Sequence, residues 1–186
     1  QLVEVTRADL VGRYVGHTAP LTNSVIQSAL GGVLFIDEAY ALYRGGEDSF
    51  GLEAIDTLVK GIEDHRDDLV VILAGYTKEM QLFLSANSGL ASRFPNQIEF
   101  PDYSGEELYK ILCSIAKSKG YTLDDGCKMP LVTYFERKQA EDAAMNGNGR
   151  MARNTLEKAI LNQSKRLVAD PDASLELLVA GDFELE

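Results

Sequence analysis

Two adjacent carboxylates, Asp37 and Glu38, follow directly after the apolar run of residues 33–36. Such a short, continuous run of β-forming residues is typical of a strand covered on both faces. In open α/β sheets, ligands bind beyond the carboxyl ends of the strands, so both acids are expected where a substrate can bind. Asp37 could hold Mg²⁺ through water, and Glu38 could orient and deprotonate an attacking water in phosphoryl transfer. The alternative is two solvated acids in a turn.

The elements that would position these acids alternate between strand and helix over residues 1–102. Strands are predicted at residues 2–6, 33–36, 69–74 and 97–100. Helices with apolar residues at three-and-four spacing are predicted at residues 22–30, 52–63 and 79–85. Because strands that alternate with helices imply crossover connections, we predict a mostly parallel α/β sheet for residues 1–102.

The character of the sequence changes after Pro101 and Asp102, where we place a domain boundary. Ser104 and Glu107 form a capping-box pattern that opens a helix. Helices are predicted at residues 104–115, 129–140 and 150–168. The sequence therefore predicts a small α-helical domain over residues 103–186.

The segment 31–42, which contains both acids, resembles the Walker B motif of AAA+ ATPases of the CbbX/CfxQ (red-type Rubisco activase) and stage V sporulation K type. The likeness extends through residues 23–29, 51–63, 67–76, 89–103 and 147–154. This resemblance implies an AAA+ P-loop-type parallel sheet with flanking helices, followed by a helical lid. It also implies an ATPase that uses ATP and Mg²⁺.

Two further catalytic residues come from the resemblance. Thr77 matches the polar "sensor 1" position that helps to place the lytic water, although many relatives have Asn there; alternatively, Thr77 is a helix N-cap. Arg93 matches the arginine finger that reaches the nucleotide of a neighbouring subunit, for which a planar, permanent charge is suited. The alternative for Arg93 is a surface ion pair with Glu99 or Asp102.

The resemblance also implies contacts with nucleotide and client. Arg150 matches "sensor 2" at the start of a lid helix, and Arg153 lies one turn later. Tyr14, Val15 and Gly16 match a pore loop, in which an aromatic face can press on an extended polypeptide without reading its sequence. The alternative for Tyr14 is a buried ring that closes this loop.

A phosphate-binding loop of the form Gly-x-x-x-x-Gly-Lys-Ser/Thr does not occur in this sequence. In the family this loop, with the first strand of the sheet, precedes the strand that residues 2–6 resemble. We therefore expect an N-terminally incomplete module that does not hydrolyse ATP by itself. We also expect unpaired backbone groups and exposed apolar faces on its sheet.

The resemblance implies an ATP-driven protein remodelling motor that assembles as a homo-oligomeric ring, commonly a hexamer, and threads a protein client through its pore. A second hypothesis is a non-hydrolysing scaffold or assembly module. A third makes Asp37 a phosphoacceptor in a receiver-like fold, but Lys78 and the helical second half do not fit that fold.

Composition restricts the class of partner. The formal net charge of −11 argues against nucleic acid, because binding to phosphate backbones normally requires a basic face. The sequence contains no run of about 18 apolar residues, so no membrane span is predicted. We expect a cytoplasmic or plastid stromal protein.

Overall fold

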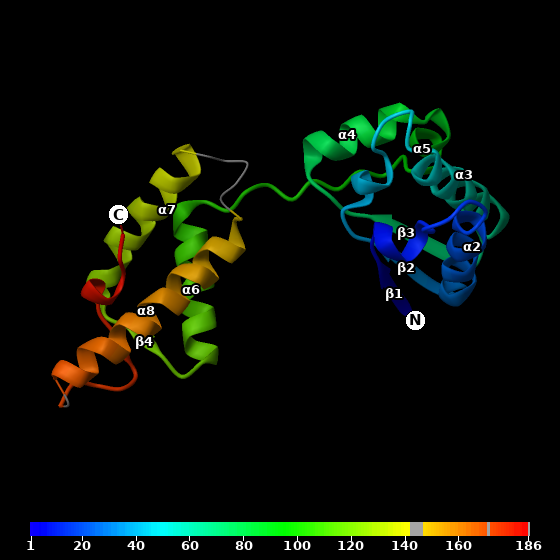
Figure 1. Ribbon diagram of the computed structural model, residues 1–186. Coiled ribbons are helices and arrows are strands. Elements are labelled where there is room, and N and C mark those ends of the chain that lie inside the picture. Colours follow the sequence, from blue (N-terminus) through cyan, green and yellow to red (C-terminus); the bar gives the residue numbers. More distant parts are fainter. Residues whose placement is uncertain (142–146, 171, 186) are drawn as a thin grey trace. The chain divides into compact units, whose positions relative to one another are not determined.

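The computed structural model describes residues 1–141, 147–170 and 172–185, which form two compact units, residues 1–99 and 100–186 (Figure 1). Each unit has an apolar core of its own. The predicted boundary after Asp102 lies in a segment, residues 94–104, that forms neither helix nor strand in the described structure.

Three parallel strands form the sheet of the first unit, in the order β1-β2-β3 (Figure 1). Their bounds are β1 (Leu2–Val5), β2 (Gly32–Ile36) and β3 (Leu69–Leu73). The connecting and following helices are α1 (Arg7–Leu10), α2 (Thr18–Ala29), the 3₁₀ helix η1 (Ala39–Leu42), α3 (Ser49–Asp64), α4 (Thr77–Ala86) and α5 (Ser88–Arg93). The predicted alternation of strands and helices is confirmed.

Helix α2 begins at Thr18, four residues before the predicted start at Thr22. Pro20 lies in its first turn, where a missing backbone N–H is tolerated because these N–H groups have no acceptor within the helix. The apolar side of α3, with Ala54, Ile55 and Leu58, packs in the same core as Leu34 and Ile36 of β2. This packing fixes the strand that leads into Asp37.

The two faces of the sheet differ in burial. Val5, Leu34 and Ile36 are buried on the face that packs against α2 and α3. On the other face, Leu2 and Val70 align with Val33, while Ile72 aligns with Phe35. Leu2, Val70 and Ile72 are exposed, so the prediction that residues 69–74 form a buried strand is wrong for Val70 and Ile72. The expected exposed apolar face is present.

A strand predicted at residues 97–100 is absent from the described structure. Ile98 and Phe100 are 81% and 87% exposed. Their alternation with polar residues resembles a strand, but a strand also requires a neighbour with which to share backbone hydrogen bonds.

The second unit consists mainly of helices α6 (Gly105–Ser118), α7 (Lys128–Glu141) and α8 (Gly149–Ala169). Two-residue strands that were not predicted, β4 (Thr122–Leu123) and β5 (Leu177–Leu178), pair in parallel, and short 3₁₀ helices lie at Asp125–Cys127 and Ala180–Asp182. The predicted capping box is confirmed, since Glu107 N donates to Ser104 Oγ at 3.3 Å and Ser104 N donates to Glu107 Oε2 at 2.8 Å.

None of the helices in the described ranges is sufficiently long and apolar to cross a membrane.

Candidate nucleotide-hydrolysis site

The two acids lie in a turn that is fixed on both sides by neighbouring strands. Asp37 N donates to Val5 O at the end of β1 at 2.9 Å. On the other side, Ala74 directly follows β3. Its N donates to Ile36 O at 2.9 Å, and its O accepts from Ala39 N at 3.0 Å. The backbone around Asp37 and Glu38 is therefore held at the carboxyl end of the parallel sheet.

Glu38 has a left-handed backbone conformation, with φ 48° and ψ 45°. For a residue other than glycine this conformation costs about 1 kcal/mol or more, and it persists where the surrounding structure enforces it. Asp37 Oδ1 accepts a hydrogen bond from Glu38 N at 3.0 Å, and η1 begins directly afterwards. Asp37 and Glu38 are exposed, so a ligand could reach both carboxylates.

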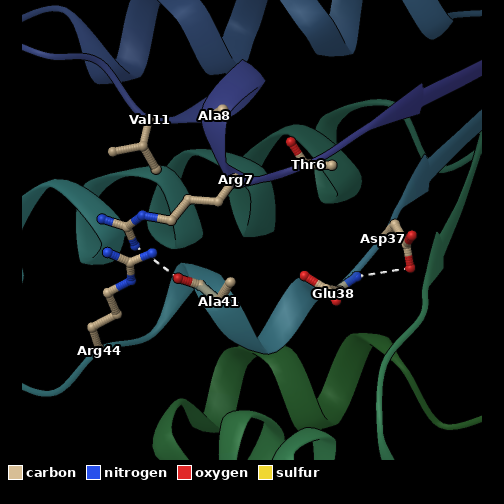
Figure 2. Close-up of a pocket in the computed structure, with 8 residues that line it drawn as sticks. All are labelled: Thr6, Arg7, Ala8, Val11, Asp37, Glu38, Ala41 and Arg44. Atoms are coloured by element: carbon tan, nitrogen blue, oxygen red, sulfur yellow. Dashed lines mark hydrogen bonds between the residues drawn. The ribbon is translucent and has the colours of Figure 1, made fainter. Parts of the chain in front are cut away.

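A pocket of about 460 Å³ opens beside this turn. Figure 2 shows Arg7 and Arg44 on one side of it and Asp37 and Glu38 on the other; Thr6, Ala8, Val11 and Ala41 complete its lining. Thr6, Arg7 and Arg44 were not among the site residues predicted from the sequence. A Thr-x-x-Asp capping pattern at Thr6 was available as a signal, and the backbone N and Oγ of Thr6 both donate to Asp9 Oδ2, at 2.9 and 3.0 Å.

Arg7 had no local signal because its partner is distant in sequence. Its guanidinium makes two hydrogen bonds to Asp48, from Nη1 to Oδ2 at 2.8 Å and from Nη2 to Oδ1 at 3.1 Å. The hydrogen bond from Arg7 is the main reason that the pKa of Asp48 lies below its usual value. The Asp48 carboxylate is therefore ionised at neutral pH and able to hold Arg7.

Thr77 is the first residue of α4, four residues after β3 ends at Leu73, and β3 is the neighbour of the strand that leads into Asp37. Tyr76, not Thr77, is the N-cap, so the alternative role predicted for Thr77 is wrong. Thr77 is exposed. Tyr40 and Tyr76 pack nearby with ring centroids 6.2 Å apart, and burial, followed by the negative charge of Glu38, raises the pKa of Tyr40.

Arg93 is the last residue of α5, and its ion-pair partner is Glu63 of α3, with 3.3 Å between Nη2 and Oε2. The alternative pairing with Glu99 or Asp102 is therefore wrong. Arg93 Nη1 also donates to Gly89 O at 3.2 Å, whereas its buried Nε has no partner among the described residues. Nε thus remains a donor without an acceptor inside its own unit.

Tyr14, Val15 and Gly16 form the tip of a loop between α1 and α2. Tyr14 and Val15 are 68% and 87% exposed, so the alternative of a buried Tyr14 is wrong. The Tyr14 ring meets the His17 ring edge to face at 5.5 Å.

The base of this loop is closed by two buried threonines. Gly12 N donates to Thr18 Oγ at 3.0 Å, and Thr22 Oγ donates to Leu10 O at 2.8 Å. A side chain on Gly12 would come within 2.8 Å of the Thr18 backbone nitrogen, so the base is tightly packed.

Arg150 and Arg153 belong to the second unit, where they lie exposed in the first two turns of α8. The N-cap of this helix, Asn148, donates to Asp102 Oδ1 at 2.9 Å and accepts from Tyr103 N at 3.1 Å. These bonds tie the start of α8 to the segment that precedes α6. Asp37, Glu38 and the end of β3 thus lie together in the first unit. Arg150 and Arg153 belong to the second unit and are not part of this group.

The carboxylates fit a magnesium ion that keeps most of its water. Within the described ranges there is no cluster of three or more His, Cys, Asp or Glu side chains suited to a metal. Mg²⁺ is usually held by one or two carboxylates together with water and substrate phosphates, rather than by an all-protein cage. Asp37 accepts one hydrogen bond from Glu38 N, which orients its carboxylate and leaves further oxygen lone pairs for such an ion.

Comparison with known families gives two matches that together cover nearly the whole chain. Residues 1–102 match the sequence model of the ATPase family associated with various cellular activities (AAA), and residues 104–186 match the AAA lid domain. The chain is similar to stage V sporulation protein K of Bacillus subtilis, with 49% identity over 90% of this chain and 52% of that protein.

Two other relatives match over a similar share of this chain. Protein CbbX of Cereibacter sphaeroides is 47% identical over 94% of this chain and 56% of its own length. The chloroplastic ribulose bisphosphate carboxylase/oxygenase activase of Cyanidioschyzon merolae is 45% identical over 94% of this chain and 59% of its own length. The chain thus spans between half and three-fifths of the length of these relatives.

Among solved structures, the AAA domain of FIGL-1 in complex with ADP resembles this chain with a TM-score of 0.64. The two sequences are 16% identical, and the match covers 97% of this chain and 59% of the other. This likeness supports the fold, and with the family matches it confirms the predicted α/β sheet with flanking helices and a helical lid.

Proposed function

This chain belongs to the AAA family of ATPases, and from that premise we propose that it is the catalytic part of an ATP-driven protein remodelling motor. The observation that carries the proposal is the strained turn of Asp37 and Glu38 at the carboxyl end of β2. A costly backbone conformation held at the position where ligands bind in α/β sheets is consistent with selection for chemistry.

Each acid has a separate role in this proposal. Asp37 holds the hydrated Mg²⁺ that accompanies ATP, and the ion neutralises charge that develops on the phosphates. Glu38 orients the attacking water and takes its proton. Thr77, at the start of the helix that follows the adjacent strand, places the same water through its hydroxyl. The exposure of all three side chains supports access by the nucleotide.

Three arginines complete the proposed nucleotide contacts. Arg93 acts across the interface on the nucleotide of a neighbouring subunit, and the partial exposure of its side chain supports a contact outside its own unit. Arg150, with Arg153 one turn later, contacts the phosphates from the lid. Such guanidinium groups stabilise the charge on a transferring phosphoryl group without changing their protonation.

The proposed client is a polypeptide that is pulled past Tyr14, Val15 and Gly16 in the pore of a homo-oligomeric, hexameric ring. The exposed aromatic and aliphatic tip supports a contact that does not depend on the sequence of the client. Relatives named as a Rubisco activase and a sporulation protein support a protein client. A cytoplasmic or stromal location is proposed on the same basis.

The test uses a longer chain in which a preceding segment supplies a Gly-x-x-x-x-Gly-Lys-Ser/Thr loop. In that chain, Glu38→Gln should still bind ATP but hydrolyse it about 10²- to 10⁴-fold more slowly, because a positioned general base has been lost. Binding is measured by calorimetry and turnover by phosphate release. Glu47→Gln, which removes the same charge from an exposed position on the following loop, is the matched control and should leave turnover unchanged.

The 186-residue chain provides the baseline. We expect no Mg²⁺-dependent turnover and weak nucleotide binding, because several charge-assisted hydrogen bonds of about 1.5–3 kcal/mol each would be lacking. Normal turnover by Glu38→Gln would remove Glu38 from the mechanism. A longer chain that binds ATP without hydrolysing it would favour the alternative, a non-hydrolysing scaffold or assembly module.

A further inference from the structure

Arg7 joins three elements through one guanidinium group. Besides its two hydrogen bonds to Asp48, Arg7 Nη1 donates to Ala41 O at 2.9 Å and to Leu42 O at 3.2 Å (Figure 2 draws the first). Arg7 follows β1, the two carbonyls belong to η1, and Asp48 is the N-cap of α3. Two parallel hydrogen bonds between guanidinium and carboxylate define an orientation as well as a contact.

The two carbonyls lie at the far end of the short helix that starts after Glu38. Its near end is held by the hydrogen bond from Ala39 N to Ala74 O. A four-residue 3₁₀ helix has strained hydrogen-bond geometry, so it depends on outside contacts to keep its shape. Arg7 supplies such contacts at the far end, and the turn of Glu38 is thereby held from both directions.

Asp48 is fixed independently of Arg7. Its Oδ1 accepts a hydrogen bond from Gly51 N at 3.1 Å at the start of α3. A side chain at position 51 would collide with the Leu42 carbonyl oxygen and would come within 2.9 Å of Arg7 Nη1. The Arg7 and Asp48 side chains are only 18% and 17% exposed, so this ion pair is shielded more than a surface pair.

We propose that Arg7 and Asp48 are positioning residues that hold the Glu38 carboxylate in its productive orientation through η1, a role that rests on the proposed ATPase function. They do not touch the reacting atoms. Their loss should let η1 and the turn before it relax, so that the Glu38 carboxylate is misplaced while nucleotide-binding groups elsewhere are unaffected.

The experiment measures ATP turnover in the longer chain that carries a phosphate-binding loop. Arg7→Gln and Asp48→Asn should each lower kcat about tenfold to a hundredfold, the scale of a displacement near 1 Å, while KM for ATP changes less than about threefold. The double variant should be no slower than the worse single variant, because the two residues act as a unit. Arg7→Lys should remain slow, because lysine keeps the charge but not the two-pronged contact.

Arg166→Gln provides a matched control in the second unit. Arg166 makes the same two-pronged contact, from Nε and Nη2 to Asp182 at 2.8 and 2.9 Å, and Nη2 also donates to Leu177 O at 3.0 Å. This substitution should leave kcat unchanged. In the 186-residue chain, amide hydrogen exchange over residues 38–44 should be faster in Arg7→Gln and unchanged in Arg166→Gln.

Two results would overturn the proposal: an unchanged kcat in Arg7→Gln, whether or not KM rises, or an equal loss of kcat in Arg166→Gln. The Glu38→Gln variant, assayed in parallel, separates this proposal from the proposed function. If Glu38→Gln is inactive while Arg7→Gln turns over normally, only the positioning role fails. If Glu38→Gln turns over normally, the proposed role of Glu38 fails first.

Discussion

At the scale of single residues, the ion pair between Arg93 and Glu63 leaves both side chains partly exposed, at 29% and 56%. Pairs of this kind contribute about 1 kcal/mol or less and are screened by salt. A nucleotide phosphate, which carries more charge than a carboxylate, could therefore draw Arg93 away from Glu63. The pair orients Arg93 without preventing a role at a subunit interface.

This role across the interface can be tested by mixing subunits of the longer chain. Arg93→Ala rings and Glu38→Gln rings should each be inactive, whereas mixed rings should regain part of the ATPase activity, because each intact site combines Glu38 of one subunit with Arg93 of the next. Phosphate release as a function of the mixing ratio is the measurement. Mixtures no more active than the sum of the separate rings would assign Arg93 to its own subunit.

Residue positions were predictable from the sequence where the signal was local. The apolar run before Asp37 indicated a strand end, and the structure has β2 ending at Ile36. Arg7 and Asp48 are 41 positions apart, so their contact depends on how α1 and α3 pack around η1. Arg93 likewise pairs with Glu63 because α3 and α5 pack together. Glu99 is nearer in sequence, but nearness in sequence does not identify the ion-pair partner.

At the scale of elements, strands and helices with a buried, periodic face were predictable, and their ends were less so. Polar and apolar residues alternate at residues 97–100, which indicates two faces of different polarity in an extended segment. A strand also needs a neighbouring strand for its backbone hydrogen bonds, so the alternation was misleading. The two-residue strands β4 and β5 escaped prediction because so short a segment has no periodicity. Both errors concern pairing between distant segments.

The base of the loop that carries Tyr14 gives a prediction at this scale. Thr22→Val should lower the free energy of unfolding of the first unit by about 1–3 kcal/mol, because the buried Leu10 carbonyl oxygen loses its donor. Urea denaturation provides the measurement. Thr57→Val is the control: Thr57 Oγ donates at 2.7 Å to Glu53 O, four residues earlier in α3, and should contribute less than about 0.5 kcal/mol. Equal losses in both variants would contradict the special role of Thr22.

At the scale of the whole molecule, each unit has its own core and the chain between them is exposed. Leu34 and Leu58 lie in the first core, and Leu112 and Leu156 lie in the second. Residues 95–104 are exposed and have no helix or strand in the described structure. The boundary after Asp102 was predicted from the change in the character of the sequence there, because segments that connect domains carry little apolar periodicity.

This organisation predicts where a protease cuts first. Limited chymotrypsin treatment should cleave after Tyr103, which is 46% exposed, and yield two resistant fragments; the bond after Phe100 should stay intact because Pro101 follows it. Mass spectrometry identifies the sites. Phe83 and Phe135 are internal controls for the two units, since both are almost completely buried. Early cleavage after either of them would contradict two independently folded units.

The closed base of the Tyr14 loop also has a consequence for the thermodynamics of client binding. Ordering a residue of a mobile loop costs about 1–2 kcal/mol in conformational entropy. The hydrogen bonds of Thr18 and Thr22 already fix both sides of this loop in the free protein. When a polypeptide binds at Tyr14 and Val15, the conformational entropy that is lost is therefore mainly that of the polypeptide and not that of the loop. A small apolar contact at these residues then contributes to the net affinity.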